Sequence, residues 1–423
     1  MTVSRRRLVR RLIAFLALDE FMPIFPVYAL LFADSGLSTS EISGLLVLWS
    51  VVTFVLEVPS GAWADIVSRR LLLCLSSIAY GAAFATWVIF PVPAGFAAGF
   101  ALWGLSSALS SGTFQALAYD ELAAVGAREQ YARVIGLGTS LTLVAMMLAT
   151  LLAAPLVSVG GYALTGWVSV GVCVVQFFVA ASLPSTPPVI SAADVAVAED
   201  LSESDHGAGG SSILEAESDA VRARAAGFAG RYMHALRVGL REAATSRVVR
   251  GGVLASAVLM GLLAFDEYFG LLLDEQGASP VAIPLLLVIP AAGQAIGGIL
   301  ATRAARWSNA RIGGLTMVAG ICIAAGALSD SPLGMVAVGV GYGALQLAIV
   351  VSDIRLQDSI AEGARATVTS VSGLLAEVVA VLVYAMFAWG SYALSVAALV
   401  AILAAVTVLL GPAVIRWLPP ARA

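Results

Sequence analysis

The sequence lacks lysine altogether and contains only two histidines, which limits the chemistry available to its apolar segments. All 23 basic residues are therefore arginines. His206 and His234 both fall in one long polar segment, outside the apolar runs. A histidine-ligated metal site or a histidine proton relay within those runs is thus excluded.

Cysteine is also scarce. Cys74, Cys173 and Cys322 each lie inside an apolar run. Their spacing fits neither a disulfide framework nor a metal cluster. We interpret them as packing residues, and we expect no metal and no cofactor.

Charge is sparse throughout the 423 residues. Only 12% of the residues are charged and 60% are hydrophobic, and the mean hydropathy of +0.95 lies far above that of a soluble domain. The composition predicts a polytopic membrane protein. Arginines from Arg5 to Arg11 precede the first apolar run, as in a signal peptide, but that run is about 20 residues long and no small-residue cleavage site follows. We expect it to be retained as the first transmembrane helix.

Apolar runs long enough to cross a hydrocarbon core of about 30 Å recur along the chain. The predicted spans cover residues 12–33, 42–60, 71–90, 94–118, 134–157, 163–183, 251–273, 281–302, 312–328, 333–352, 367–388 and 391–411. Six spans precede a long polar segment and six follow it. This pattern predicts an all-α fold of twelve transmembrane helices in two pseudo-symmetric six-helix bundles.

The polar segment divides the chain into three predicted parts. Residues 1–183 form the first bundle, residues 184–250 a loop, and residues 251–423 the second bundle. The first part of the loop is acidic and carries proline and glycine, which is typical of disorder. Its second part is basic and predicts an amphipathic helix on the anionic inner leaflet.

The arginines predict the orientation of the chain. With the N-terminus inside, every arginine falls on the cytoplasmic side or at its boundary, and the outer loops carry acidic residues instead. Those acidic residues are Asp34, Glu41, Asp274, Glu275 and Asp330. Because arginine accumulates in cytoplasmic loops, we expect both termini and the long loop to be cytoplasmic.

The stretch from Glu57 to Arg70, EVPSGAWADIVSRR, is the most informative polar interruption. An apolar run stops there at a proline, which predicts the turn between spans 2 and 3. Gly61 would allow two backbones to approach closely, and Asp65 can bond a helix N-terminus or pair with an arginine. We predict that Gly61, Asp65, Arg69 and Arg70 form a conformational latch.

The twelve spans, the 6+6 arrangement, the long central loop and the GAWADIVSRR turn together resemble the major facilitator superfamily. The resemblance covers nearly the whole chain apart from the acidic insert. In that family the loop between spans 2 and 3 carries a glycine, an aspartate four residues later, a second glycine and then basic residues. Gly61, Asp65, Arg69 and Arg70 fit this pattern, and Ser68 replaces the second glycine. The resemblance implies transport by alternating access and not an enzyme.

The segment SSGTFQALAYDEL, which contains Asp120, resembles the end of span 4 in a bacterial branch of drug-efflux permeases. This likeness implies a proton-coupled antiporter in the plasma (inner) membrane of a bacterium. Phe100 stands where the family usually has an arginine linked to proton coupling. Glu57 and Asp120 are our candidate gating residues.

Acidic residues inside the predicted spans carry the most chemical information. They are Asp19 and Glu20 in span 1, Asp266 and Glu267 in span 7, and Glu377 in span 11, with no basic residue at their depth. An ionised group at the bilayer centre costs about 2.5 to 3.5 kcal/mol, so such an acid must face water, face a substrate or be protonated. We predict that these five residues bind substrate or protons, with the span 1 pair as the coupling site. We expect the two pairs to sit at different depths.

The sign of these charges predicts the substrate. A cationic or neutral lipophilic compound fits a pathway that offers carboxylates and no arginine. The aromatic candidates for contact with it are Phe21, Tyr28, Phe265, Tyr268 and Tyr384.

Two alternatives stay open at this point. One is proton-coupled uptake of a neutral metabolite such as a sugar. The other belongs to a different class, a polytopic membrane enzyme or scaffold without transport. For the leading hypothesis, the partners are a small-molecule substrate, protons and the lipid bilayer; we expect no nucleic acid and a monomer.

Overall fold

The computed structural model describes residues 4–184, 246–360 and 365–421. Regular structure in these ranges is entirely helical, which confirms the all-α prediction. The predicted acidic loop and most of the basic amphipathic helix that follows it lie outside the described residues. The limits predicted for the three parts of the chain stay predictions.

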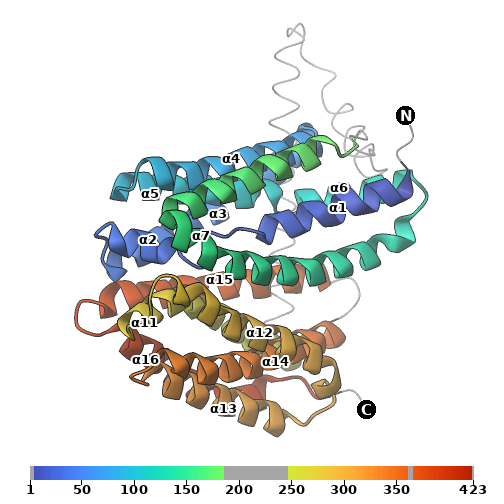
Figure 1. The fold of residues 1–423 in the computed structure, drawn as a ribbon. Coiled ribbons are helices and arrows are strands. Elements are labelled where there is room, and N and C mark those ends of the chain that lie inside the picture. The colour runs from blue at the N-terminus through green and yellow to red at the C-terminus, as the bar shows by residue number, and fades with distance from the viewer. Residues whose placement is uncertain (1–3, 185–245, 361–364, 422–423) are drawn as a thin grey trace, which may run out of the picture.

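Helices of the first half account for spans 1 to 6 (Figure 1). They are α1 (Arg5–Glu20), α2 (Tyr28–Asp34), α3 (Thr39–Ile66), α4 (Arg69–Ile89), α5 (Pro93–Ser110), α6 (Thr113–Ala124), the short 3-10 helix η1 (Arg128–Gln130) and α7 (Tyr131–Ala181).

Helices of the second half account for spans 7 to 12. They are α10 (Arg247–Leu262), η2 (Leu263–Tyr268), α11 (Phe269–Glu275), α12 (Ala282–Ala304), α13 (Asn309–Ala327), η3 (Pro332–Gly334), α14 (Met335–Ser359), α15 (Arg365–Gly390) and α16 (Val396–Trp417).

Span 1 is broken, where the sequence predicted one continuous helix. Helix α1 ends at Glu20, and α2 begins only at Tyr28. Pro23 and Pro26 occupy the gap, and a proline has no N–H group to donate to the preceding turn. The break places Asp19 and Glu20 at the end of a helix inside the protein.

Three further interruptions follow from glycine or from tighter winding. Gly112, with a φ of 69°, separates α5 from α6 within predicted span 4. Gly161, with a φ of 62°, turns the chain between predicted spans 5 and 6 inside α7. Left-handed backbone of this kind favours glycine because it has no Cβ atom. Span 7 tightens into the 3-10 helix η2, which carries Asp266 and Glu267.

The predicted turn around Glu57 to Arg70 is shorter than expected. Helix α3 continues past Pro59 to Ile66, and α4 begins at Arg69. The expectation that the helix stops at the proline was therefore wrong, since neighbouring groups in a membrane protein can satisfy the backbone that a proline leaves free. Gly61 and Asp65 lie on the last turns of α3, and the side chain of Asp65 is not among those described.

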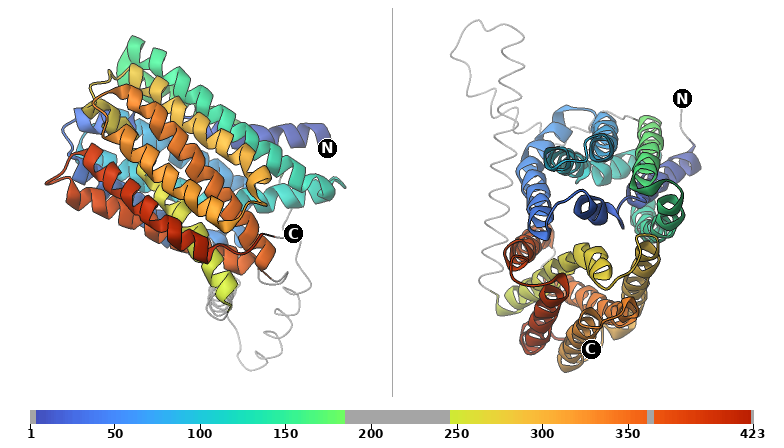
Figure 2. Two further views of the ribbon diagram at one scale, coloured as in Figure 1. Left: turned by 90° about the horizontal axis from the view of Figure 1, so that it is seen from below. Right: turned by 60° about the vertical axis from the view of Figure 1, so that its left-hand side comes forward.

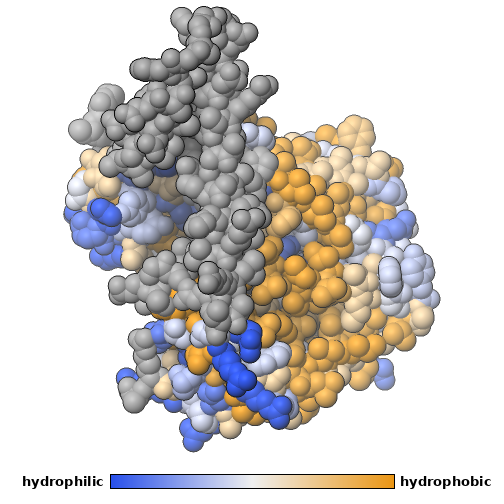
Figure 3. Space-filling view, turned by 180° about the vertical axis from the view of Figure 1, so that it is seen from behind, coloured by the Kyte–Doolittle hydropathy of each residue, from blue (hydrophilic) through white to orange (hydrophobic). Residues whose placement is uncertain are grey.

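The outer surface suits a bilayer. In the described ranges, nine helical stretches are long and apolar enough to span a membrane, and one of them, Arg128–Ala181, contains both span 5 and span 6. Figure 3 shows a broad hydrophobic face flanked by hydrophilic residues. Together with the broken spans 1 and 4, these stretches account for the twelve predicted spans.

The two halves stack on one another (Figures 1 and 2). Between them, α3 packs against α15, α7 against α12, and α2 against α11. We call the end of the molecule where α1 begins and α16 ends the basic end, because Arg5, Arg69 and Arg416 lie on its helix termini. The other end, with α2 and α11, is called the opposite end.

Candidate functional site

A cavity of about 450 Å³ lies between the two halves. Both acid pairs predicted from the sequence line it: Asp19 and Glu20 from α1, and Asp266 and Glu267 from η2. No arginine or histidine is among the described residues that line this cavity. We call it the central cavity. The groups in its described lining that can carry a charge near neutral pH are carboxyl groups.

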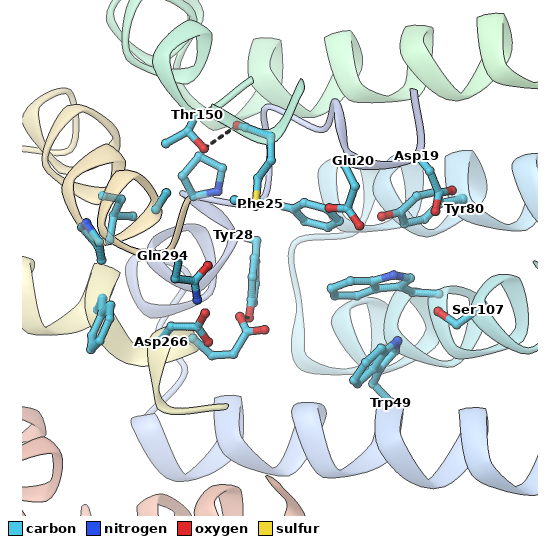
Figure 4. Close-up of a pocket in the computed structure, with 18 of the residues that line it drawn as sticks. Asp19, Glu20, Phe25, Tyr28, Trp49, Tyr80, Ser107, Thr150, Asp266 and Gln294 are labelled. Atoms are coloured by element: carbon cyan, nitrogen blue, oxygen red, sulfur yellow. Dashed lines mark hydrogen bonds between the residues drawn. The ribbon is translucent and has the colours of Figure 1, made fainter. Parts of the chain in front are cut away.

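The span 1 pair is held within the first half. The side-chain amide of Gln176, on α7, donates a hydrogen bond of 2.7 Å to Oδ1 of Asp19. Glu20 lies close enough to Asp19 for their charges to interact. Figure 4 shows both carboxyl groups on the side of the cavity that Tyr80 occupies. The pair therefore keeps its position relative to the first half, with Glu20 presented to the cavity.

The span 7 pair is linked to the other half of the molecule. The hydroxyl of Tyr28, on α2, donates a hydrogen bond of 2.5 Å to Oε2 of Glu267. Asp266 is exposed although it lies deep in the protein, because it faces the cavity. Its close charged neighbour is Glu267. Figure 4 places Asp266 and Gln294 at the other side of the cavity from Asp19.

Aromatic rings surround the span 1 side of the cavity. Trp103 is the centre of this group: its ring centroid lies 5.2 Å from that of Phe25, 5.3 Å from Trp49 and 6.2 Å from Tyr80. All four rings line the cavity. Aromatic faces next to carboxylates attract organic cations through the negative ring face and through apolar contact. We call these four residues the aromatic box.

Hydroxyl groups line a further part of the wall. Ser106, Ser107 and Ser110 come from α5, and Thr150 comes from α7. Thr150 donates to the backbone carbonyl of Met146 at 2.8 Å, so its oxygen remains an acceptor for a ligand (Figure 4). The wall thus offers both donors and acceptors for a polar substrate.

Side-chain hydrogen bonds join the two halves on the side of the cavity toward the opposite end. In addition to the bond between Tyr28 and Glu267, the hydroxyl of Tyr268 donates to Oγ of Ser43 at 2.8 Å. Nearer the opposite end, Ser40 bonds to the hydroxyl of Tyr392 at 3.3 Å. Each of these three is a side-chain hydrogen bond that joins one half to the other. The described state is thus fastened across the halves on that side of the cavity.

Two predicted acidic residues lie elsewhere. Glu377 on α15 does not line the central cavity, and neither does Glu57 on α3. The two carboxyl groups lie close enough for their charges to interact, across the contact between α3 and α15. Their position favours a role in the contact between halves over direct substrate binding.

At the basic end, Arg69 forms an ion pair with Asp120. This pair joins the start of α4 to α6, so a predicted latch residue meets a predicted gating residue. Arg70 donates to the carbonyl of Leu183 at 3.5 Å. The partner predicted for these arginines was Asp65, whose side chain is not among those described.

Of the aromatic residues selected from the sequence, only Tyr28 lines the cavity. Phe265 and Tyr268 are buried in the core, and Tyr268 stacks on Phe387 at a centroid distance of 3.5 Å. The aromatic box was missed because aromatic residues are frequent in all spans and their direction depends on packing. Gln176 was also missed, because glutamines in membrane helices usually form hydrogen bonds between helices and nothing in the sequence marks one as part of a site.

Comparison with known proteins identifies the family. The model of the Major Facilitator Superfamily matches residues 12–384. The chain belongs to this superfamily. No curated protein sequence matches the chain.

Solved structures of facilitators share the fold over nearly their whole length. The nucleoside transporter NupG has a TM-score of 0.64 at 11% identity, covering 98% of this chain and 99% of its own. The POT family transporter PepTSo has a TM-score of 0.67 at 13% identity, with 98% of each chain covered. A D-xylose-proton symporter has a TM-score of 0.64 at 12% identity, with 96% of each chain covered.

Membership in this superfamily makes the protein a multi-pass membrane transporter of small molecules rather than an enzyme. The fold of two six-helix bundles predicted from the sequence is confirmed. At such low identity the solved structures show the fold alone. The substrate, the direction of transport and the drug-efflux branch must be argued from the cavity.

Proposed function

We propose that this facilitator exports small cationic or lipophilic compounds in exchange for protons. The observation that supports the proposal is the central cavity, which carries four carboxyl groups and no basic residue among its described lining. Carboxyl groups in a site of low polarity must be protonated or neutralised by a cation. A proton and a cationic substrate would therefore compete for the same groups, which is the requirement for exchange.

The span 1 pair is our proposed coupling site. Glu20 lies beside Asp19 and faces the aromatic box, so an organic cation bound there would meet carboxylate and ring faces together. When the cation leaves, a proton would take its place on the pair. Protonation from the outer side and release to the inner side would then couple proton entry to cation export.

In this proposal, the span 7 pair couples ligand binding to the contact between the two halves. Glu267 accepts the hydrogen bond from Tyr28 most strongly as a carboxylate. A proton or cation on this pair would weaken that bond, and the contact between the halves would weaken with it. Occupancy of the cavity would thereby bias the opening of the opposite end.

Uptake of a neutral hydroxylated metabolite in symport with protons is the second candidate. The serine row of α5 with Thr150 and Gln294 supports it, because hydroxyls and amides bind sugars through paired donors and acceptors. The likeness to a D-xylose-proton symporter is a likeness of fold only.

Transport in proteoliposomes distinguishes the two candidates. The purified protein is reconstituted with an imposed pH gradient, and movement of ethidium and of radiolabelled xylose is measured in both directions. Export predicts ethidium accumulation on the acidic side, together with alkalinisation of that side as protons leave. Proton-driven xylose accumulation on the alkaline side, without ethidium movement, would replace export by symport.

A further inference from the structure

A second hollow, of about 970 Å³, lies at the basic end between the start of α1 and the start of α7. Four arginines line it: Arg5, Arg6 and Arg10 from α1, and Arg133 from α7. No acidic residue is among its described lining. This surface, which we call the arginine hollow, is separate from the central cavity.

The arginines converge on the hollow from two helices. On α1, Arg6 and Arg10 are one helical turn apart and therefore share a face. Arg133 approaches from the first turn of α7. Arg5 is already engaged, because its Nε donates to Oε1 of Gln130 at 2.9 Å and joins α1 to the segment before α7. Arg6, Arg10 and Arg133 are all exposed and can bond a ligand.

The floor of the hollow is apolar and continues along the outside of the protein. Val9, Val134 and Leu137 line it. Leu137 begins an exposed stripe on α7 at intervals of three and four residues, which continues with Leu141, Val144, Leu148 and Leu151.

The stripe faces away from the central cavity. Met146 and Thr150 of α7 line the cavity. At about 100° per residue, Leu137, Val144 and Leu148 point roughly 160 to 180° away from Met146. The same geometry places Arg133 over the stripe, one turn before Leu137. An apolar stripe on this face of a membrane helix faces the acyl chains of lipid.

We propose that the arginine hollow binds one anionic phospholipid, with its phosphate between Arg6, Arg10 and Arg133 and its acyl chains along the Leu137 stripe. Guanidinium groups match phosphate oxygens in a bidentate manner and retain their charge at all physiological pH values. Basic hollows at the inner surface of membrane proteins bind lipid headgroups through the same chemistry. A free phosphate would use the arginines and leave the apolar stripe without a role, so the geometry favours the lipid.

Native mass spectrometry with phosphatidylglycerol tests the proposal. The full-length protein in mild detergent is titrated with this lipid, and the affinity of the first bound molecule is measured. We expect Arg6→Gln with Arg133→Gln to weaken that affinity by about tenfold or more, as loss of contacts to a charged group does. Phosphatidylcholine, whose headgroup carries no net charge, should bind weakly to both proteins.

The matched control is Arg303→Gln with Arg311→Gln, two exposed arginines in the second half and outside the hollow. This control should leave the affinity for the first bound lipid unchanged. Equal weakening by both double variants would mean that the arginines attract anionic lipid diffusely, and would overturn the proposal of a defined site. Arg6→Lys with Arg133→Lys keeps the charge and should weaken binding by less than the glutamine variant. Displacement of the lipid by glycerol 3-phosphate at equal concentration would show that a free phosphate suffices and would also overturn the proposal.

Discussion

The two acid pairs of the central cavity resemble one another in sequence, as ALDEF and AFDEY, but they are held in different ways. Asp19 accepts its hydrogen bond from Gln176 in its own half. Glu267 accepts its hydrogen bond from Tyr28 in the other half. Movement of one half relative to the other would therefore break the second bond and leave the first intact.

This difference assigns separate tasks to the two pairs in our account. The span 1 pair, fixed within one half and surrounded by the aromatic box, is suited to bind the same ligand in every state of the cycle. The span 7 pair, linked across the halves, is suited to couple ligand binding to the position of the halves. Tyr80 lies near Asp19 and Glu20, whereas Tyr342 lies near Asp266 and Glu267.

Loss of the span 1 carboxylates should have the largest effect. Asp19→Asn with Glu20→Gln removes two charged contacts of about 1.5 to 3 kcal/mol each, so proton-driven ethidium transport should fall by about a hundredfold or more. The pH-gradient assay in proteoliposomes measures it, with correct insertion checked by protease accessibility. Transport at the wild-type rate would transfer the coupling role to the span 7 pair.

Removal of the hydrogen bond between Tyr28 and Glu267 should have a larger effect on the conformational equilibrium than on the affinity for the ligand. Tyr28→Phe should shift the population toward opening of the opposite end by roughly tenfold to a hundredfold, because one bond to a charged group is lost. Spin labels at Ala94 and Leu333, on exposed positions of the two halves, report this opening as a longer distance. The native cysteines are replaced for the measurement.

Tyr162→Phe is the matched control for that variant. Tyr162 also donates to a carboxylate, Asp34, at 2.8 Å, but both residues belong to the first half. This variant should leave the distance distribution unchanged. An equal shift in both variants would mean that any loss of a tyrosine bond loosens the protein, and the special role of Tyr28 would be refuted.

Gln176→Leu should have a moderate effect that is restricted to binding. Asp19 then loses its amide donor, and the apparent affinity for ethidium should weaken by about three- to tenfold. The label distances between the halves should stay as in the wild type, because the bond lies within one half. A large shift in those distances would contradict the division of tasks between the pairs.

Glu377→Gln should have the smallest effect. Its carboxyl group lies outside the cavity, so ethidium transport should stay within about twofold of the wild-type rate, as for substitutions away from a binding site. Initial rates at saturating ethidium provide the measurement. A loss as large as that of the span 1 variant would mean that protons pass through the contact between α3 and α15.

Much of the fold could be predicted from the sequence because a bilayer imposes simple rules. Length and hydropathy located the spans, and the one-sided arginines predicted their orientation. The breaks at Pro23 and Pro26 were not predicted, since hydropathy does not register a missing N–H donor. The continuation of α3 past Pro59 was also missed. A proline ends a helix only where neighbouring groups cannot bond the backbone carbonyl that it leaves free, and the sequence does not show those neighbours.

The site could be predicted only in part. An acid within an apolar run is costly, and that cost identified Asp19, Glu20, Asp266 and Glu267 without a structure. The same argument selected Glu377, which does not line the cavity. Placing an acid in an apolar run costs the same free energy whether the acid lies between helices or in a cavity. Only the packing of the helices therefore distinguishes the two cases. The bonds to Gln176 and Tyr28 join residues 157 and 239 positions apart and leave no local pattern.

The competition between proton and cation at the span 1 pair is the central claim, and proton release on binding tests it most directly. Ethidium is added to the purified wild-type protein in weakly buffered solution, and the released protons are measured with a pH indicator. Our account predicts about one proton released per bound ethidium near neutral pH, and release abolished in Asp19→Asn with Glu20→Gln. Undiminished proton release from that variant on binding ethidium would contradict the account.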